Sequence, residues 1–223
     1  MKRVVIPELL DTDSGTPAEI AASLSDLRRI NHWFGGVATT RVMVHYVAGK
    51  VGTRSLSLLE VAAGAGDVPL AARAELKREG IQLEVTLLDR ASSHLRNRSN
   101  ETPVVTGDAL TLPFANSSFD LVSCCLFAHH LAPEEVVLFV NEGLRVCRTA
   151  VLINDLVRHP VHLALVYAGL PLYRSRLTQH DAPASVRQAY TLDEMHDMLR
   201  RTRAGGVVAR RHFLFRMGVV VWR

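Results

Sequence analysis

Cysteine is scarce in this chain of 223 residues, which contains three, two of them adjacent. An odd count without the paired spacing of a metal motif argues against a disulfide framework and indicates reduced thiols in a cytosolic protein. Long apolar runs are missing too, since the longest, residues 161–173, is shorter than the about 20 residues of a membrane span. The first fifteen residues show no signal-peptide pattern. We therefore expect a cytoplasmic protein without a membrane span.

Aromatic residues make up only 6% of the chain, and they do not alternate with basic residues in the way that stacks nucleic-acid bases. The net charge is a modest +4, and many arginines gather in the last quarter of the chain. Several of them alternate with apolar residues in strand-like runs and are expected to face solvent. We therefore expect no nucleic-acid partner. The composition is ordinary for a globular protein, and the chain is long enough to bury a large core.

From residue 55 onward, short apolar segments rich in Leu and Val alternate with helical patterns. Strands that are apolar on both faces are typical of a parallel sheet covered by helices, so the alternation predicts a doubly wound α/β fold. The predicted strands are residues 56–61, 83–89, 103–106, 119–126 and 150–155, and the predicted helices between them are residues 68–79, 91–98 and 133–147.

The two ends of the chain depart from this alternation. Thr16 followed by Pro17 and Glu19 is a helix start, and two N-terminal helices are expected before residue 50. Trp33 and Phe34 are expected in the core, and a lid hinge at residues 31–34 is the alternative. At the C-terminus, only one residue separates the strand-like segments 207–215 and 217–222. A link this short allows only antiparallel pairing.

The loop after the first strand carries the main functional signal. Residues 62–66 read Ala-Ala-Gly-Ala-Gly, and small residues there let a ligand lie on the backbone at a helix N-terminus. Glu60 and Asp67 flank this loop, and Asp89 ends the next strand. Two carboxylates disfavour a dinucleotide pyrophosphate and suit a ligand that carries an ammonium and a sulfonium. The third dinucleotide glycine is also replaced, by Pro69.

These residues resemble the class I S-adenosylmethionine-dependent methyltransferases over about residues 50–155, and the terminal hairpin fits as well. The stretches Leu-Pro-Phe, Ser-Ser-Phe-Asp-Leu-Val and His-His-Leu also resemble those of the ubiquinone/menaquinone-type methyltransferases. The first motif of the family is an acid followed by three alternating glycines, of which the first is Ala62 here. A second stretch, Gly107-Asp108-Ala109 before Leu-Pro-Phe and Ser-Phe-Asp, resembles the adenine motif and its run into the fourth strand.

The resemblance implies a seven-stranded Rossmann-like sheet with an antiparallel C-terminal hairpin and N-terminal helices as a lid. It divides the chain into a helical cap, residues 1–50, and a methyltransferase domain, residues 51–223, with an acceptor-pocket insertion at about 156–190. It implies S-adenosylmethionine as the cofactor, held by Glu60, Ala62, Gly64, Gly66, Asp89, Arg90, Asp108, Ala109 and Leu126.

Two of these acids also have a structural interpretation. Asp89, the expected acceptor for the ribose hydroxyls, stands where a helix N-cap is needed. Asp108, the expected acceptor for the adenine amino group, stands in a Gly-Asp turn. A plain strand–helix turn at Gly64 and Gly66 is the corresponding alternative for the loop.

Methyl transfer to an acidic hydroxyl needs a base, and histidine suits that role near neutral pH. His130 is the first candidate because it follows the fourth strand at the ligand edge, with His129 second and His180 third. Tyr167, Tyr173, Arg187 and Tyr190 are expected to line the acceptor pocket. We expect no metal ion, because the strand that precedes the histidines does not end in an acid pair.

The predicted function is methyl transfer to a small molecule, with the oxygen of a phenolic, quinone or polyketide-like acceptor favoured by the apolar insertion. Two other functions stay open from the sequence: an NAD(P)-dependent oxidoreductase, and a non-catalytic module that binds S-adenosylmethionine. The sequence does not indicate an oligomeric state.

Overall fold

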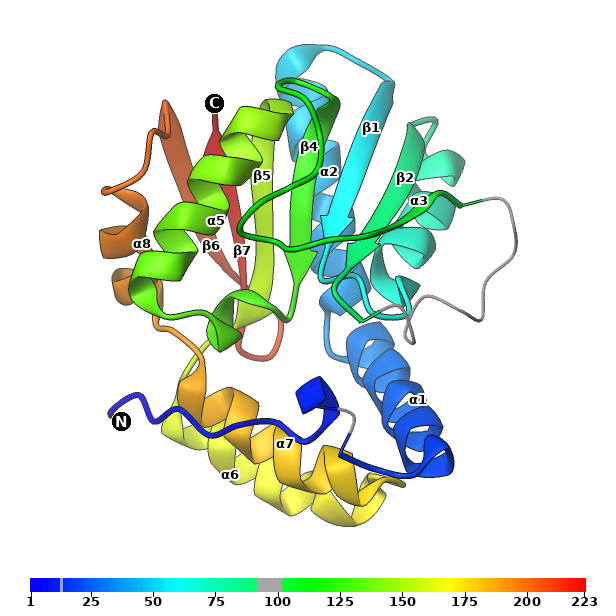
Figure 1. Ribbon diagram of the computed structural model, residues 1–223, viewed down its shortest axis with the longest axis vertical. Helices are drawn as coiled ribbons and strands as arrows, with labels where there is room; N and C mark the ends of the chain where they lie inside the picture. The colour runs from blue at the N-terminus through cyan, green and yellow to red at the C-terminus, as the bar shows by residue number, and fades with distance from the viewer. Residues whose placement is uncertain (13, 92–101) are drawn as a thin grey trace.

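The computed structural model describes residues 1–12, 14–91 and 102–223, and within them seven strands form one mixed sheet (Figure 1). The strand order is β3-β2-β1-β4-β5-β7-β6. The strands are β1 (Ser55–Val61), β2 (Gln82–Asp89), β3 (Val104–Thr106), β4 (Phe119–Cys125), β5 (Cys147–Leu156), β6 (Gly206–His212) and β7 (Arg216–Trp222).

Strands β1 to β5 are parallel, and β7 runs antiparallel to both β5 and β6. The predicted α/β sheet and its C-terminal hairpin are therefore confirmed. The strand order reverses between β1 and β4, since β2 and β3 lie on one side of β1 and later strands lie on the other. A reversal of this kind opens a crevice at the carboxyl ends of the strands, which is where ligands bind in open α/β sheets.

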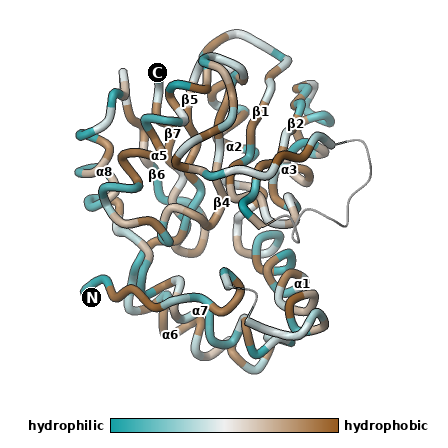
Figure 2. The backbone as a smooth tube through the Cα atoms, viewed as in Figure 1, coloured by the Kyte–Doolittle hydropathy of each residue, from teal (hydrophilic) through white to brown (hydrophobic). Residues whose placement is uncertain are grey.

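Two helical layers cover the faces of the sheet. Helices α2 (Gly36–Val51) and α3 (Asp67–Arg78) pack on one face, and α5 (Pro133–Val146) and α8 (Leu192–Leu199) pack on the other. Each layer closes its own cluster of buried apolar side chains, and both clusters draw residues from the central strands. In Figure 2 the central strands are mostly brown, the colour of hydrophobic residues, as expected for strands buried on both faces.

A third group of elements lies beyond the carboxyl ends of the strands, in the lower part of Figure 1. It consists of the N-terminal segment with a short 3₁₀ turn (Leu10–Thr12), α1 (Pro17–Trp33), α6 (Pro160–Gly169) and α7 (Arg176–Gln188). Helix α1 begins as predicted, with Thr16 and Glu19 in a reciprocal capping box. This group covers the edge of the sheet where a ligand is expected.

Most predicted elements agree with the structure to within a few residues, and the expected helix 91–98 lies outside the described residues. One expectation about the core was wrong. Trp33 is 63% exposed and Phe34 is also exposed, because α1 ends at Trp33 and the chain turns at Gly35 toward α2. None of the helices described here is long and apolar enough to cross a membrane.

Candidate active site

A cavity of about 570 Å³ lies at the carboxyl edge of the sheet, where the strand order reverses. Its size is in the range of small-molecule binding sites. The loops after β1, β2, β3 and β4 form one wall, and α1, α6, α7 and the N-terminal segment form the other. Every residue that the sequence predicts for the cofactor lines this cavity: Glu60, Ala62, Gly64, Gly66, Asp89, Arg90, Asp108, Ala109 and Leu126.

The loop after β1 is left-handed at alternating residues. The backbone φ is 52° at Ala62, 50° at Gly64 and 60° at Gly66, three positions two residues apart. Glycine adopts this conformation without cost, whereas an alanine is strained there. Ala62 therefore keeps the backbone shape of the alternating glycine motif although it is not glycine. The loop is closed by a hydrogen bond from the Gly66 N–H to the Ala63 carbonyl at 2.6 Å.

The two acids that flank the loop have different surroundings. Glu60 is 2% exposed and accepts a hydrogen bond from the Ser123 hydroxyl on β4. Burial raises the pKa of Glu60 to about 7, although the Ser123 hydrogen bond opposes that rise. Asp67, at the first position of α3, lies 3.2 Å from the Arg28 guanidinium of α1. Asp67 thus links the cofactor loop to the helix that covers it.

Asp89 and Asp108 both hold the backbone of their own loops. Asp89 accepts from the Gly64 N–H at 2.7 Å and from the Ala91 N–H at 2.9 Å. Asp108 accepts from the Leu110 N–H at 2.9 Å, which is the turn-stabilising contact expected of a Gly-Asp step. Each carboxylate oxygen has two acceptor sites, so these bonds leave both side chains able to accept from a ligand.

A strained turn carries the chain from β4 to the two histidines. Leu126 has φ of 55°, an unusual value for a leucine, and lines the cavity. The 3₁₀ turn η2 (Ala128–His130) follows at once. The tight turn brings both histidine rings back to the sheet edge, and their centroids are 4.2 Å apart. Strained backbone of this kind is concentrated at functional sites.

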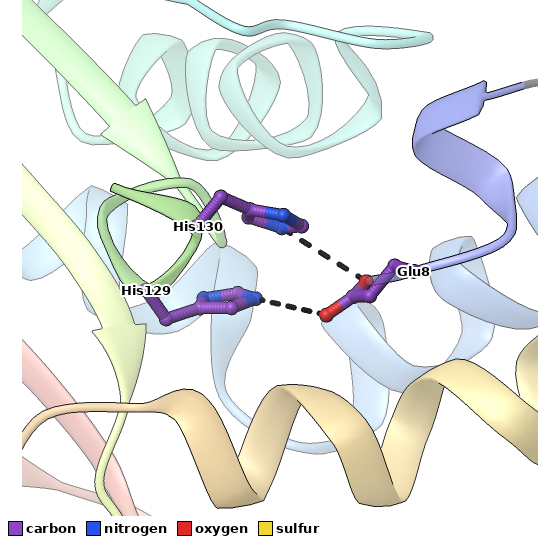
Figure 3. A group of neighbouring side chains, drawn as sticks. All are labelled: Glu8, His129 and His130. Carbon is purple, nitrogen blue, oxygen red and sulfur yellow. Dashed lines mark ion pairs between the residues drawn. The ribbon is translucent and has the colours of Figure 1, made fainter. Parts of the chain in front are cut away.

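His129 is a buried ring between two carboxylates. Its Nδ1 lies 2.6 Å from Asp155 Oδ1 at the end of β5, and its Nε2 lies 3.5 Å from Glu8 Oε1 (Figure 3). Burial alone lowers the pKa of His129, but the charge and hydrogen bond of Asp155, together with Glu8, outweigh burial and raise it to about 10. An imidazolium that keeps its proton at neutral pH is not a free base.

His130 is the more accessible ring, with 20% of its side chain exposed against 3% for His129. Its Nδ1 lies 2.8 Å from Asp11 Oδ2, and its Nε2 faces Glu8 Oε2 at 3.9 Å (Figure 3). The two neighbouring rings thus turn the same nitrogen toward one carboxylate. Glu8 is not among the site residues that the sequence predicts.

Glu8 reaches the histidines because the N-terminal segment is tied across the cavity. Asp181 on α7 accepts from the backbone N–H groups of Leu9 and Leu10 at 2.8 and 3.1 Å. Arg3 donates to three backbone carbonyls, those of Gln188, His129 and Leu131. No local sequence signal marks Glu8, because its position depends on contacts with residues more than a hundred positions away.

Several other predicted residues lie elsewhere. His180 is not among the cavity-lining residues; its side chain is partly exposed and its Nδ1 is 2.8 Å from the Asp181 carboxylate of the same helix. Of the four predicted pocket residues only Tyr173 lines the cavity. The Arg187 guanidinium donates to the Tyr167 hydroxyl on the surface, and Tyr190 is buried with its hydroxyl on the Leu131 carbonyl. The expectation was therefore wrong for Tyr167, Arg187 and Tyr190.

One arginine of the C-terminal group is fully buried, against the expectation that these residues face solvent. The Arg216 guanidinium donates to the side-chain oxygens of Asn31 and Asn154 and to the Cys125 sulfur. Asn31 and Cys125 line the cavity. Arg216 therefore supports the cavity wall between α1 and β4. The expectation was wrong because strand β7 is buried on both faces, which the alternation of arginine and apolar residues did not indicate.

Comparison with known proteins agrees with this geometry. Residues 59–153 match the family model described as a methyltransferase domain. The ubiquinone/menaquinone biosynthesis C-methyltransferase UbiE of Laribacter hongkongensis is 28% identical over 218 residues, covering 88% of this chain and 87% of that protein. The matching family model and this relative support a class I S-adenosylmethionine-dependent methyltransferase.

Solved structures show the same fold. The plantazolicin methyltransferase BpumL in complex with S-adenosylhomocysteine superposes with a TM-score of 0.74 at 12% identity, covering 97% of this chain and 94% of that one. PigF with S-adenosylhomocysteine gives a TM-score of 0.60 at 17% identity, covering 89% of this chain and 58% of that one. The cofactor of this enzyme is S-adenosylmethionine, and its activity is methyl transfer to a small molecule.

Proposed function

We propose that the enzyme transfers the methyl group of S-adenosylmethionine to an oxygen of a phenolic, quinone or polyketide-like acceptor, at the histidine end of the cavity. The observation that carries the proposal is the juxtaposition of the two histidines and Glu8 with the cofactor loop in one cavity. An ionisable hydroxyl is the acceptor that such a polar end suits.

In this proposal the loop after β1 holds the methionine part of the cofactor. The ionised Glu60 carboxylate pairs with the ammonium, and the left-handed loop at Ala62, Gly64 and Gly66 lets the cofactor lie close to the backbone. Asp89 accepts from the ribose hydroxyls and Asp108 from the adenine amino group. Their lining positions and spare acceptor sites support these roles.

The acceptor occupies the remaining space between α1, α6 and α7, which we propose as the acceptor pocket. The walls there are largely apolar, so a flat apolar body is favoured over a charged one. The apolar and aromatic lining residues are Leu10, Leu24, Leu27, Ile30, Phe127, Val166, Tyr173 and Val186. A hydroxyl on that body then has a polar partner at His130 and Glu8.

The reaction is an in-line displacement. A lone pair of the acceptor oxygen attacks the methyl carbon, the carbon–sulfur bond breaks, and its electron pair stays on sulfur as the thioether of S-adenosylhomocysteine. The acceptor hydroxyl loses its proton at the histidine end, where His130 is the more accessible ring. The enzyme contributes alignment of the three atoms and removal of that proton.

A carbon acceptor is the second candidate, because the curated relative from Laribacter hongkongensis is named a C-methyltransferase. The ring carbon beside a phenolate oxygen is nucleophilic once the hydroxyl has lost its proton. The same cavity would serve both outcomes, and the position of the new methyl group on the product separates them.

The test uses S-adenosylmethionine with a ¹³C-labelled methyl group and a panel of phenols, hydroxyquinols and hydroxylated polyketides. Formation of S-adenosylhomocysteine is followed by mass spectrometry, and the labelled methyl is placed by carbon NMR. A label on oxygen supports the proposal. A label on ring carbon, or turnover with amines alone, overturns the oxygen assignment.

A further inference from the structure

We infer that Glu8, His129 and His130 form a site for a Zn²⁺-type divalent ion, whose open coordination position faces the acceptor pocket. One ligand atom from each residue lies within 4.8 Å of the other two. Figure 3 shows the three side chains converging, with both rings directed at the carboxylate. The inference rests on the proposed function and names the group that activates the acceptor oxygen.

The first argument is the direction of the lone pairs. A neutral ring that donates its Nδ1 proton to a carboxylate has a bare lone pair on Nε2. His129 faces Asp155 with Nδ1 at 2.6 Å, and His130 faces Asp11 with Nδ1 at 2.8 Å. Both Nε2 atoms then point at Glu8, which is itself an acceptor. A divalent cation bound here would take the place of the proton that His129 carries between Asp155 and Glu8, and it would contact all three converging groups.

The second argument is an unsatisfied buried atom. His129 Nε2 is buried and makes no hydrogen bond to any residue that the structure describes; its contact with Glu8 Oε1 is an ion pair at 3.5 Å, while Nδ1 on the other side of the ring is held by Asp155. Buried polar nitrogens without a partner are rare in proteins and mark a missing group. His129 is one of the residues that line the same cavity as the cofactor loop, so a ligand at this ring lies at the active site.

The third argument is the second layer of contacts. Histidines that bind metal nearly always donate their other ring nitrogen to a carboxylate, and metal-binding carboxylates are themselves hydrogen-bonded. All three residues here meet that description. Glu8 Oε1 accepts from the Ser185 hydroxyl at 2.6 Å and from the Gln188 amide at 2.7 Å, which leaves Oε2 for the ion.

Spacing and ligand type select the ion. Ligand atoms around a tetrahedral Zn²⁺ with bonds of about 2.1 Å lie about 3.4 Å apart. Glu8 Oε2, the oxygen left for the ion, lies 3.9 Å from His130 Nε2, and one ligand atom from each of the three residues lies within 4.8 Å of the other two. Two imidazoles favour Zn²⁺ over Mg²⁺, and three protein ligands leave one position for an outside oxygen.

The open position gives the ion a role in the reaction. An acceptor hydroxyl that binds there has its pKa lowered by the positive charge, so its proton is released to water and the oxygen attacks the methyl group as described above. His130 is then a ligand of the ion, and it no longer has to take the proton itself. The chemistry selects acceptors whose reacting oxygen can coordinate zinc.

The test begins with binding of zinc alone. Protein stripped with a chelator is titrated with Zn²⁺ by calorimetry and with Co²⁺ by visible absorption, for the wild type, Glu8→Gln and His130→Gln. Glu8→Gln keeps an acceptor for Ser185 and Gln188, so the N-terminal segment stays anchored. His180→Gln is the matched control, since its ring lies outside the cavity.

We expect one ion per wild-type and His180→Gln chain, and affinity at least a hundredfold weaker in Glu8→Gln and His130→Gln. Equal affinity in all four proteins overturns the inference, and so does the absence of zinc binding to the wild type. Methyl transfer that proceeds equally without zinc overturns the role of the ion. Zinc binding without any oxygen methylation overturns the proposed function and leaves the metal site standing.

Discussion

Glu60 offers the sharpest single perturbation, because its carboxyl is buried next to the cofactor loop. Its pKa lies at about 7, against an ordinary 4.5, since burial disfavours the ionised form. Glu60→Gln keeps the size of the side chain and an oxygen acceptor for Ser123, and it removes the titration. We expect this variant to differ from the wild type in the pH dependence of its stability.

The magnitude follows from the two pKa values. The pKa rises by 7 minus 4.5, which is 2.5. One pKa unit corresponds to about 1.36 kcal/mol, so the shift corresponds to about 3 kcal/mol of unfolding free energy. The folded-state pKa is raised, so the favourable contribution is fully present below pH 4.5 and is lost as the pH rises through 7. The cofactor-free wild type therefore loses about 3 kcal/mol relative to Glu60→Gln across this window.

The assay is urea unfolding of the cofactor-free wild type and Glu60→Gln at pH 5 and pH 8. Taking the difference between the two proteins cancels the titration of all other groups. We expect the difference in unfolding free energy to move in favour of the variant by most of the about 3 kcal/mol. A difference that stays constant between the two pH values refutes the reasoning.

Three further predictions test the loop and the N-terminal segment. Ala62→Gly removes the left-handed strain and should raise the free energy of unfolding by about 1 kcal/mol, whereas the control Ala63→Gly should lower it by about 0.5–1 kcal/mol in the same urea titration. Asp89→Ala should weaken binding of S-adenosylhomocysteine by about 1–3 kcal/mol in calorimetry, and Asp89→Asn, which keeps an acceptor for Gly64, should lose less; unchanged affinity in both contradicts the ribose assignment. Asp181→Ala frees two backbone N–H groups of the N-terminal segment and should cost about 1–3 kcal/mol of stability, with faster amide exchange there than in the wild type.

The sheet and the cofactor wall were predictable because their signals are local. Apolar strands that alternate with helices, a loop of small residues and an acid at a strand end each lie within a few residues of one another. Even the departure at Ala62 proved compatible with the left-handed backbone that the motif needs. The terminal hairpin followed from the short link between its strands.

The acceptor side was not predictable in the same way, because it is assembled from distant segments. Glu8 meets the histidines only because Asp181 and Arg3 tie the N-terminal segment to α7 and to the turn after β4. The expectation of no metal ion stays a prediction, which the inferred metal site opposes; it considered only acids at the strand ends, and Glu8 does not lie there. Tyr167 and Arg187 pair with each other on the surface, and a single sequence does not show which face of a helix meets the cavity.

The central claim is methyl transfer from S-adenosylmethionine to an acceptor oxygen in the cavity that holds Glu60, His130 and Glu8. The most direct measurement is carbon NMR of the product made from ¹³C-methyl-labelled cofactor and a hydroxylated aromatic acceptor. The account predicts the label on oxygen, with turnover reduced at least tenfold in His130→Gln and unaffected in His180→Gln. A label on carbon or nitrogen, or equal turnover in both variants, contradicts it.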